Sequence, residues 1–268
     1  MVWIFCCVSA RWLPCPADLR APVCSMADAQ EHQAHRSIHI PYAIQPEESR
    51  SAFYENYWKK VALELLLKHA SPQGKTVLDF GCGRGETVQI FRAAGFDAQG
   101  TDMDPECVRL TRQFGPAVVL ESDNVLGQFG RDSFDIVTSF HVLEHVENPK
   151  KTLSELAQVA REYVLLAVPN LRYLHRVFDR RIDKNLINAG HLQSWDHWHL
   201  LNLAERYCQL ELVEWGFDAT ALSGLSNLSE KFFGNRFTIW LETGLFRKLF
   251  PFHGISIIGL FRVKKHPY

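Results

Sequence analysis

The sequence predicts an α/β fold, in which a doubly wound, mostly parallel sheet of seven strands carries helices on both faces. Short apolar, β-branched or aromatic segments alternate with helical segments along the chain, and such alternation with short connections is typical of parallel sheets. A glycine-rich turn follows the first of these segments. In open parallel sheets, a turn at this position commonly approaches a ligand.

The elements follow from hydrophobic spacing. Trp58, Val61 and Leu65 recur at helical spacing and predict a helix before the first strand. Strands are expected at 77–80, 96–101, 117–120, 134–140, 163–168, 211–220 and 255–263. Helices are expected between them at 86–94, 105–114 and 149–161.

Residues 221–250 break this rhythm and predict a helical insertion or cap near the C-terminus. Its apolar residues at helical spacing are Phe232, Phe233, Phe237, Trp240, Leu241, Leu245 and Leu249. They indicate either core packing or a hydrophobic lid. Its flanking basic residues are Lys231, Arg236, Arg247 and Lys248. They leave open a lipid-linked substrate or a peripheral membrane contact.

The N-terminal segment is interpreted separately from the fold. Residues 1–36 are expected to be disordered or an upstream extension, and residues 37–268 to form a single domain. The apolar run from Val2 to Ala10 has no preceding basic residue and no convincing cleavage site. We therefore favour an extension that ends before Met26 over a targeting signal.

Composition narrows the class of protein. Of 268 residues, 47% are hydrophobic and 22% charged, which excludes a largely disordered chain. The net charge of −1 argues against an extended nucleic-acid footprint. The sequence lacks an apolar stretch of the roughly 18 residues that a membrane helix needs. Beyond four cysteines near the N-terminus, only Cys82, Cys107 and Cys208 occur, which favours free thiols and a cytoplasmic protein.

The clearest motif is a glycine-rich turn between a buried strand and a helix. It reads Gly81-Cys82-Gly83-Arg84-Gly85-Glu86, and glycines allow a tight turn and close approach of a ligand. A dinucleotide fingerprint would have glycine or alanine where Glu86 stands, and the sequence lacks a phosphate-binding loop. The turn thus favours a ligand other than NAD or a nucleoside triphosphate.

Acidic residues follow the next two strands. Asp102 ends the second strand, where a carboxylate is expected to accept hydrogen bonds from ribose hydroxyls. Asp123 follows the third strand and could accept the amine of an adenine. Each of them could instead be an ordinary turn residue, but their order behind the glycine turn favours a nucleoside-containing ligand.

The order of these motifs resembles the class I S-adenosylmethionine-dependent methyltransferases, which have a Rossmann-like domain. The resemblance covers roughly residues 53–220 and includes Phe134-Asp135-Ile136-Val137. Leu-Glu-His-Val at 143–146 and Val-Pro-Asn at 168–170 resemble the ubiquinone-biosynthesis-type small-molecule methyltransferases. The resemblance implies methyl transfer from S-adenosylmethionine to an oxygen, less often a nitrogen, of a small or lipid-linked metabolite.

The resemblance also implies a set of cofactor contacts. These are Asp79, Gly81, Gly83, Gly85, Asp102, Met103, Asp123, Asn124, Phe140 and His141. The glycines would hold the amino-acid end of the cofactor, with Asp79 orienting their turn. Asp102 would hold the ribose, Met103 would pack on the adenine, and Asp123 with Asn124 would contact the adenine edge. The last two residues of the set would lie near the methionine part.

Two histidines, His145 and His191, are candidates for a general base. Methyl transfer mainly needs positioning, but a hydroxyl or ammonium acceptor must lose a proton, which a histidine can take near neutral pH. His141 and His145 are expected one helical turn apart after the fourth strand. His191 and Trp195 match a His-Leu-x-x-Trp segment that borders the acceptor pocket in the resembled family. The structural alternative for His145 is a hydrogen bond to the backbone.

A metal centre is not expected. Residue types that bind metal ions occur close together here, namely His191, Asp196, His197 and His199. However, Asp196 is expected to cap a helix, so neighbouring side chains cannot all point to one centre.

A row of basic residues precedes this segment. It contains Arg172, Arg176, Arg180 and Lys184, which indicate either the solvated face of a helix or a site for an anionic acceptor.

Two other functions stay open, a nucleic-acid or protein methyltransferase and a non-catalytic S-adenosylmethionine-binding protein. Enzymes that methylate base amino groups commonly carry an Asn/Asp-Pro-Pro-aromatic loop after the fourth strand. This chain reads Ser139-Phe140-His141-Val142 there, which disfavours a nucleic-acid partner.

Overall fold

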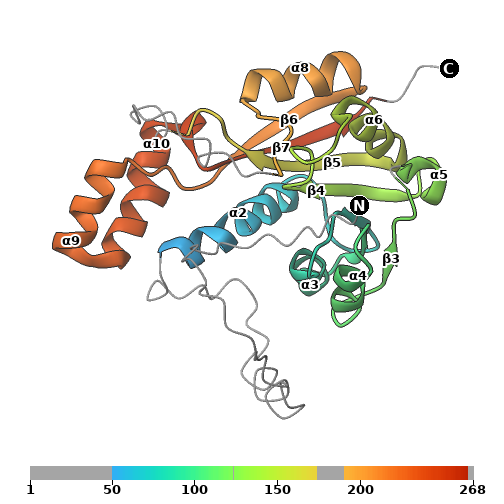
Figure 1. Ribbon diagram of the computed structural model, residues 1–268, viewed down its shortest axis with the longest axis horizontal. Helices are drawn as coiled ribbons and strands as arrows, with labels where there is room; N and C mark the ends of the chain where they lie inside the picture. The colour runs from blue at the N-terminus through green and yellow to red at the C-terminus, as the bar shows by residue number, and fades with distance from the viewer. Residues whose placement is uncertain (1–49, 123, 174–189, 265–268) are drawn as a thin grey trace, which may run out of the picture. The chain divides into compact units, whose positions relative to one another are not determined.

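The computed structural model describes residues 50–122, 124–173 and 190–264, which form a seven-stranded sheet covered by helices (Figure 1). The strands are β1 (Thr76–Phe80), β2 (Asp97–Asp102), β3 (Ala117–Val119), β4 (Phe134–Phe140), β5 (Ala160–Pro169), β6 (Leu210–Phe217) and β7 (Ser256–Val263). The main helices are α2 (Arg50–Leu67), α3 (Glu86–Ala93), α4 (Pro105–Thr111), α5 (Val125–Phe129), α6 (Pro149–Val159), α8 (His197–Tyr207) and α9 (Ser223–Trp240). The predicted extension at 1–36 lies outside the described residues.

The strand order is β3-β2-β1-β4-β5-β7-β6. The strands from β3 to β5 are parallel, and β7 runs antiparallel between β5 and β6. This arrangement confirms the predicted doubly wound, mostly parallel sheet. The order reverses between β1 and β4, and the carboxyl ends of strands at such a point form the usual ligand crevice.

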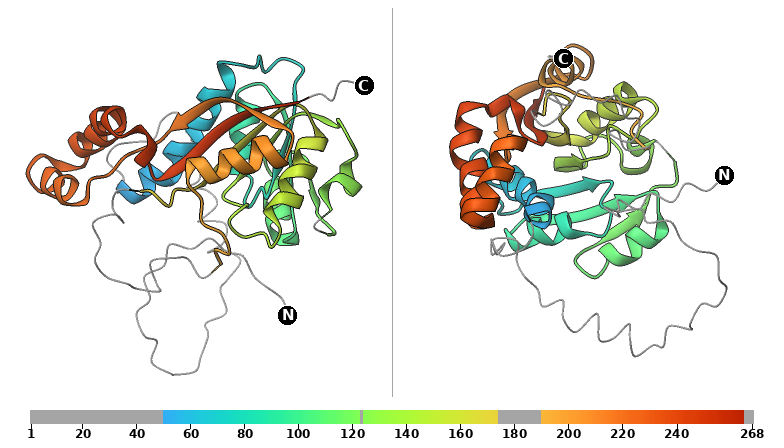
Figure 2. Two further views of the ribbon diagram at one scale, coloured as in Figure 1. Left: turned by 90° about the horizontal axis from the view of Figure 1, so that it is seen from above. Right: turned by 60° about the vertical axis from the view of Figure 1, so that its left-hand side comes forward.

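Two apolar clusters cover the two faces of the sheet. On one face, Leu153 and Leu156 of α6 and Leu200 of α8 pack against the strands. On the other, Leu65 of α2 and Val88 of α3 do so. Figures 1 and 2 show these helix pairs on opposite sides of the sheet. Strands β1, β4 and β7 are buried on both faces along most of their length, which explains their largely apolar sequences.

The boundaries differ from the prediction in a few places. α5 was not expected, because a helix of five residues leaves little periodicity to detect. β5 begins at Ala160, directly after α6 ends at Val159, because Ala160 already has extended backbone angles. β6 ends at Phe217, before the expected Thr220. Among the described helices, none is both long enough and apolar enough to cross a bilayer.

The helical insertion is confirmed by α9, the π-helical turn η3 (Leu241–Phe246), α10 (Arg247–Leu249) and the short helix η4 (Pro251–His253). Core packing, which we considered for its apolar stripe, is wrong for most of the large side chains. Phe232, Phe233, Phe237, Trp240, Leu245 and Leu249 are all exposed. Helical spacing identified the stripe correctly, but spacing alone does not reveal what covers it.

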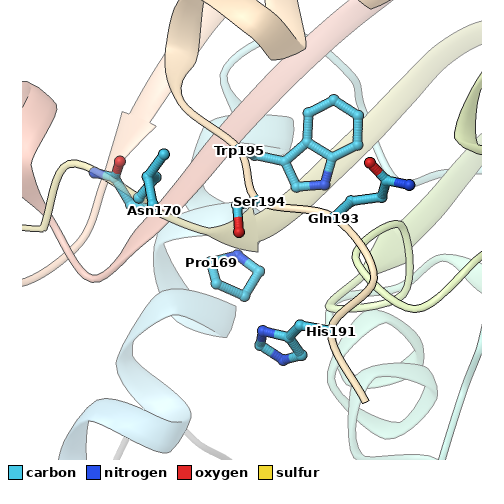
Figure 3. A pocket seen from close by; sticks show the side chains of 7 residues that line it. Pro169, Asn170, His191, Gln193, Ser194 and Trp195 are labelled. Carbon is cyan, nitrogen blue, oxygen red and sulfur yellow. The ribbon is translucent and has the colours of Figure 1, made fainter. Parts of the chain in front are cut away.

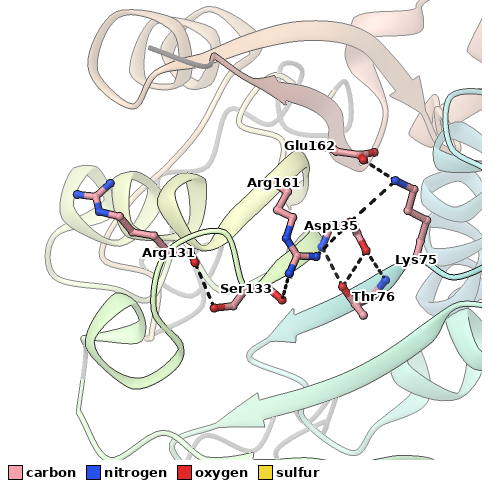
Figure 4. A network of polar contacts seen from close by, with 7 residues as sticks. All are labelled: Lys75, Thr76, Arg131, Ser133, Asp135, Arg161 and Glu162. Carbon is pink, nitrogen blue, oxygen red and sulfur yellow. Dashed lines mark hydrogen bonds and ion pairs between the residues drawn. The ribbon is translucent and has the colours of Figure 1, made fainter. Parts of the chain in front are cut away.

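The amino ends of β1, β4 and β5 are joined by a network of polar side chains (Figure 4). Asp135 accepts hydrogen bonds from the backbone and hydroxyl of Thr76 at 2.8 and 2.9 Å and from Arg161 at 3.2 Å. Partial burial alone would raise the pKa of Asp135, but the hydrogen bonds from Thr76 outweigh it and lower the pKa. Lys75 pairs with Glu162 beside it. This end of the sheet is therefore held by groups that satisfy one another.

Candidate functional site

The glycine turn lies at the carboxyl end of β1, between that strand and α3. Gly81 has φ +77°, and a Cβ there would lie 2.3 Å from a methyl group of Val142. Gly83 has φ +52°, but no heavy atom lies within 4 Å of the place where its Cβ would be. Gly81 is thus required by packing within the chain, whereas the surface at Gly83 is open to a ligand.

Asp102 supports the turn from the end of β2. Its carboxylate accepts hydrogen bonds from the backbone amides of Gly83 and Asp104, both at 2.9 Å. Asp79 instead accepts a hydrogen bond from Thr138 at 2.7 Å and is 2% exposed. Burial raises the pKa of Asp79 to about 7, against the hydrogen bond from Thr138. The contact with the glycine turn that we expected of Asp79 is therefore made by Asp102.

The predicted adenine contacts lie at the ends of β2 and β3. The side chain of Met103 is 64% exposed next to Asp102, so its thioether is open to a flat ring. Asn124 caps α5 by accepting a hydrogen bond from the Gly127 amide at 2.8 Å. Asp123 lies outside the described residues.

Phe140 and His141 end β4 and meet α2, which passes close to this edge. The Trp58 ring lies 5.2 Å from that of Phe140 and 4.9 Å from that of His141, centre to centre. His141 has φ +56°, and residues 143–145 form a turn rather than the expected helical turn, closed by the bond from the His145 amide to the Val142 carbonyl. The positive φ at His141 redirects the chain away from the strand.

Glu144 is buried between histidines at this edge. Its carboxylate lies 3.4 Å from Nδ1 of His141 and 3.9 Å from Nε2 of His145, and it is 1% exposed. Neither carboxylate oxygen makes a hydrogen bond with a described residue. The ring of His145 in turn lies 4.8 Å from that of His191. The structure thus brings the two predicted base candidates together, around a carboxylate.

The segment that carries His191 is fixed by main-chain contacts from both sides. The amides of Leu192 and Gln193 donate to the carbonyl of Glu144 at 2.7 and 3.1 Å, and the carbonyl of Trp195 accepts from Leu171 at 2.7 Å. A small pocket opens beside it, as Figure 3 shows. Its lining consists of Pro169, Asn170, Leu171, His191, Gln193, Ser194 and Trp195. His191 and Trp195 both lie on this pocket, next to the end of β5.

His145 also makes a hydrogen bond to the backbone, which we considered above as its alternative role. Its Nδ1 lies 2.8 Å from the carbonyl oxygen of Gly190. Since a carbonyl only accepts, the neutral ring carries its proton on Nδ1. Nε2 is then the basic nitrogen, so the bond orients the ring and does not exclude a role as base.

The metal set considered from the sequence does not converge. His197 is buried against Trp215 and Phe252, and burial lowers its pKa to about 4. His199 is exposed and bonded to Asp196, which caps α8 as predicted. A different trio, Glu144, His145 and His191, places its ligand atoms within 4.8 Å of one another.

Two contributors were missed by sequence reasoning. Glu144 was recognised only as part of a motif, although a glutamate between two histidine-bearing positions is itself a signal of a paired imidazole. The spacing of Trp58 predicts only that it belongs to a helix, and no local pattern places α2 across the end of β4. Its position depends on packing against distant strands, such as β6 and β7.

The residues present fit S-adenosylmethionine. Gly83 leaves open space at the turn, Asp102 offers a carboxylate beside it, and Met103 presents an exposed apolar side chain. The hydroxyl of Ser139, at the end of β4, is buried and makes no hydrogen bond with a described residue. These groups line the point where the strand order reverses, as a nucleoside with a charged amino-acid end would require.

Comparisons with known proteins agree with this geometry. The ubiquinone biosynthesis O-methyltransferase of an Azoarcus species is 28% identical over 171 residues, which are 59% of this chain and 70% of that protein. The ajmaline N-methyltransferase of Rauvolfia serpentina is 30% identical over 110 residues, which are 38% of this chain and 37% of that protein.

A solved structure shares the fold. Magnesium protoporphyrin IX methyltransferase from Synechocystis, crystallised with S-adenosylhomocysteine, superimposes with a TM-score of 0.53 at 16% identity. The match covers 90% of this chain and 95% of that one. Residues 51–222 also match the methyltransferase domain family, close to the range of the resemblance seen in the sequence. The chain belongs to this family and is a class I methyltransferase that uses S-adenosylmethionine.

Proposed function

We propose that this enzyme methylates an oxygen, or less commonly a nitrogen, of a small or lipid-linked metabolite, with His145 or His191 taking the proton of the acceptor. The observation that carries the proposal is the contact of these two rings beside Glu144, at the sheet edge that holds the glycine turn. The O-methyltransferase and N-methyltransferase relatives support the two acceptor atoms.

S-Adenosylmethionine supplies an electrophilic methyl group on a sulfonium, which reacts by in-line displacement. The glycine turn and Asp102 would hold the nucleoside and amino-acid parts and so direct that methyl group toward the ends of β4 and β5. The side chains around His191 would border the acceptor on the opposite side. Positioning of this kind removes much of the entropic cost of bringing two molecules together.

Proton removal would be the task of the histidines. With Nδ1 of His145 bonded to Gly190, its Nε2 can receive the acceptor proton. The positive charge that forms on the ring then faces the Glu144 carboxylate at 3.9 Å. The Gly190 carbonyl would thus orient the base, and Glu144 would stabilise the charge that forms on it, which suits general base catalysis.

The finer features of the acceptor belong to the same proposal. An anionic group on the acceptor could be bound by the basic row after β5, of which Arg172 is described and residues 174–189 lie outside the described part. Cys82 and Cys208 are buried as free thiols, which supports a cytoplasmic location.

The test is incubation of the full chain with isotopically labelled S-adenosylmethionine and a metabolite extract, followed by mass spectrometry of labelled products. We expect label in a small or lipid-linked product, on oxygen or nitrogen. Label found only in protein or nucleic acid would contradict the proposal. A chelator arm, with restoration by a divalent ion, distinguishes proton removal by histidine from catalysis by a metal held at Glu144, His145 and His191.

A further inference from the structure

The segment between β6 and β7 forms a helical arm, which consists of α9, η3 and α10 (residues 223–249). Both ends of this arm attach to the sheet edge that holds the candidate site. Phe217 at the end of β6 pairs with Ile257, and Pro169 at the end of β5 pairs with Ser256. Figures 1 and 2 show the helical arm extending beyond this edge. The base of the arm therefore lies at the same edge as the site.

The helical arm buries several polar side chains and exposes most of its large apolar ones. Its buried side chains include Ser226, Ser229 and Thr238, and the Thr238 hydroxyl donates to Ser229 at 2.9 Å. The exposed ones include Leu225, Leu228, Phe232, Phe233, Phe237, Trp240, Leu245 and Leu249. A helix on a globular domain normally turns its apolar stripe to the core. This arm turns small polar groups inward beside Ile239 and Phe246, and most of its large apolar side chains outward.

The exposed aromatic rings form one continuous group. Phe233 is 68% exposed and Trp240 is 60% exposed. Phe237 joins them, with ring centres 5.1 Å from Phe233 and 5.6 Å from Trp240. The chain bends between them at Gly234, whose φ of +80° suits glycine. Single exposed apolar residues are common, but a continuous group of this kind marks an interaction site.

The acidic and basic side chains of the helical arm lie in different surroundings. Its two acidic residues, Glu230 and Glu242, both pair with Arg50 of α2 at 3.3 Å. The exposed basic side chains on the arm are Lys231, Arg236 and Lys248. Lys231 lies next to the aromatic group, with Nζ 5.9 Å from the centre of the Phe232 ring. The outer surface of the arm is therefore apolar and basic.

We propose that the helical arm docks on the surface of a bilayer that contains anionic lipids. Aromatic rings are favoured at the boundary between headgroups and acyl chains, and neighbouring lysines are attracted to anionic headgroups. A second copy of the chain is a poorer partner, because pairing two such arms would bring basic groups of like charge together. The acids that could neutralise them are already engaged by Arg50.

Docking would turn the carboxyl edge of the sheet toward the membrane. The base of the arm is bonded to the site, since Asn170 donates to the carbonyls of Phe252 and Gly254 at 3.1 and 2.9 Å. The enzyme could then meet a lipid-linked acceptor at the bilayer surface. The docking itself does not depend on the proposed acceptor or on methyl transfer, and its test needs neither.

The test is flotation of the full chain with vesicles of phosphatidylcholine mixed with phosphatidylglycerol, and with vesicles of phosphatidylcholine alone. We expect binding to the anionic vesicles that weakens as salt is added. The double variant Phe233→Ser with Trp240→Ser should bind at least about tenfold more weakly, because two exposed rings no longer enter the interface. Trp198→Ser, at another exposed tryptophan on α8, is the matched control and should bind as the parent does.

A second pair of variants isolates the charges. Removing them with Lys231→Gln and Lys248→Gln should weaken binding about fivefold for each charge on anionic vesicles only. The exposed Arg206 on α8 provides the control Arg206→Gln. All replaced side chains are exposed, so circular dichroism should show unchanged folding. Failure of the folded parent to bind anionic vesicles overturns the proposal, as does equal binding by the aromatic double variant. A dimer that dissociates in that variant, without vesicle binding, would assign the arm to a second copy instead.

Discussion

Polar groups at the two ends of the parallel sheet differ in whether they have partners within the chain. At the amino ends, Thr76, Asp135 and Arg161 bond to one another across three strands. At the carboxyl ends, Ser139 and Glu144 are buried without a hydrogen bond to a described residue. An unpaired buried polar group costs about 1–3 kcal/mol. A fold retains such a cost where a ligand supplies the missing partners, so the difference separates the supporting end from the working end.

The largest expected effect concerns the histidines at the working end. His145→Ala and His191→Ala should be assayed separately, and loss of the general base should lower the methylation rate by about 10²–10⁴-fold. The affinity for S-adenosylmethionine should hardly change, because neither ring belongs to the glycine turn. Rates measured at several pH values, with calorimetry for the cofactor, check both parts. Full activity in both variants would leave catalysis by positioning alone.

Glu144→Gln provides the matched test of the carboxylate. The amide keeps the shape but loses the charge that faces His145 and His141. We expect a lower rate with a shifted pH profile and no loss in the free energy of unfolding. A variant that is strongly destabilised but retains the parental pH profile would mean that Glu144 serves structure only.

The next effect concerns Asp102, on the cofactor side of the working end. Asp102→Ala should weaken binding of S-adenosylmethionine or its demethylated product by about 10–100-fold, because a hydrogen bond to a charged group contributes about 1.5–3 kcal/mol. Calorimetry of the parent and the variant gives the two dissociation constants. Asp102 also holds the Gly83 amide, so Asp102→Asn controls for the structural part. A parent protein that binds NAD equally well would refute the assignment of the ligand.

The contrast between the two ends also explains what the sequence could predict. The glycine turn and Asp102 were identified because strand, turn and acid are neighbours in sequence, and parallel strands bring their ends together. The contact of His145 with His191 was not predicted. It depends on the β-bridge between Trp195 and Asn170 and on the hydrogen bonds that the carbonyl of Glu144 accepts. These long-range main-chain contacts leave no pattern in the sequence.

The helical arm shows the same limit in another way. The spacing of its apolar residues predicted helix correctly, but not which side of the helix would be exposed. The inner side includes Ser226, Ser229 and Thr238, and small polar residues give no periodic signal of burial. The choice between core packing and exposure was therefore settled only by the arrangement of α9 against its neighbours.

At the supporting end, Asp135→Ala should lower the free energy of unfolding by about 1–3 kcal/mol, since its partners Thr76 and Arg161 lose a charged, half-buried acceptor. Denaturant unfolding at neutral pH measures this change. The affinity for S-adenosylmethionine should stay at the parental value, because the network lies at the opposite end of β4. A fall in cofactor affinity without a loss of stability would reverse the roles that we assign to the two ends.

The smallest effect should come from two carboxyls buried near the working end. Burial raises the pKa of Asp79 and of Asp218 to about 7 in the folded chain, although Asp79 accepts a bond from Thr138 and Asp218 one from Ser256. In the unfolded chain both titrate near 4. The folded state therefore binds more protons between these values, and the free energy of unfolding should fall as the pH rises from about 4 to about 7. Asp79→Asn and Asp218→Asn each remove one titrating group and should each reduce the slope of this fall by up to about 1.4 kcal/mol per pH unit. Denaturant unfolding at several pH values compares the slopes with that of Asp97→Asn, at an exposed carboxyl on β2. If both variants keep the parental slope of stability against pH, these carboxyls have partners in solution that stabilise their charged forms. The working end would then have more hydrogen-bond partners than its geometry indicates.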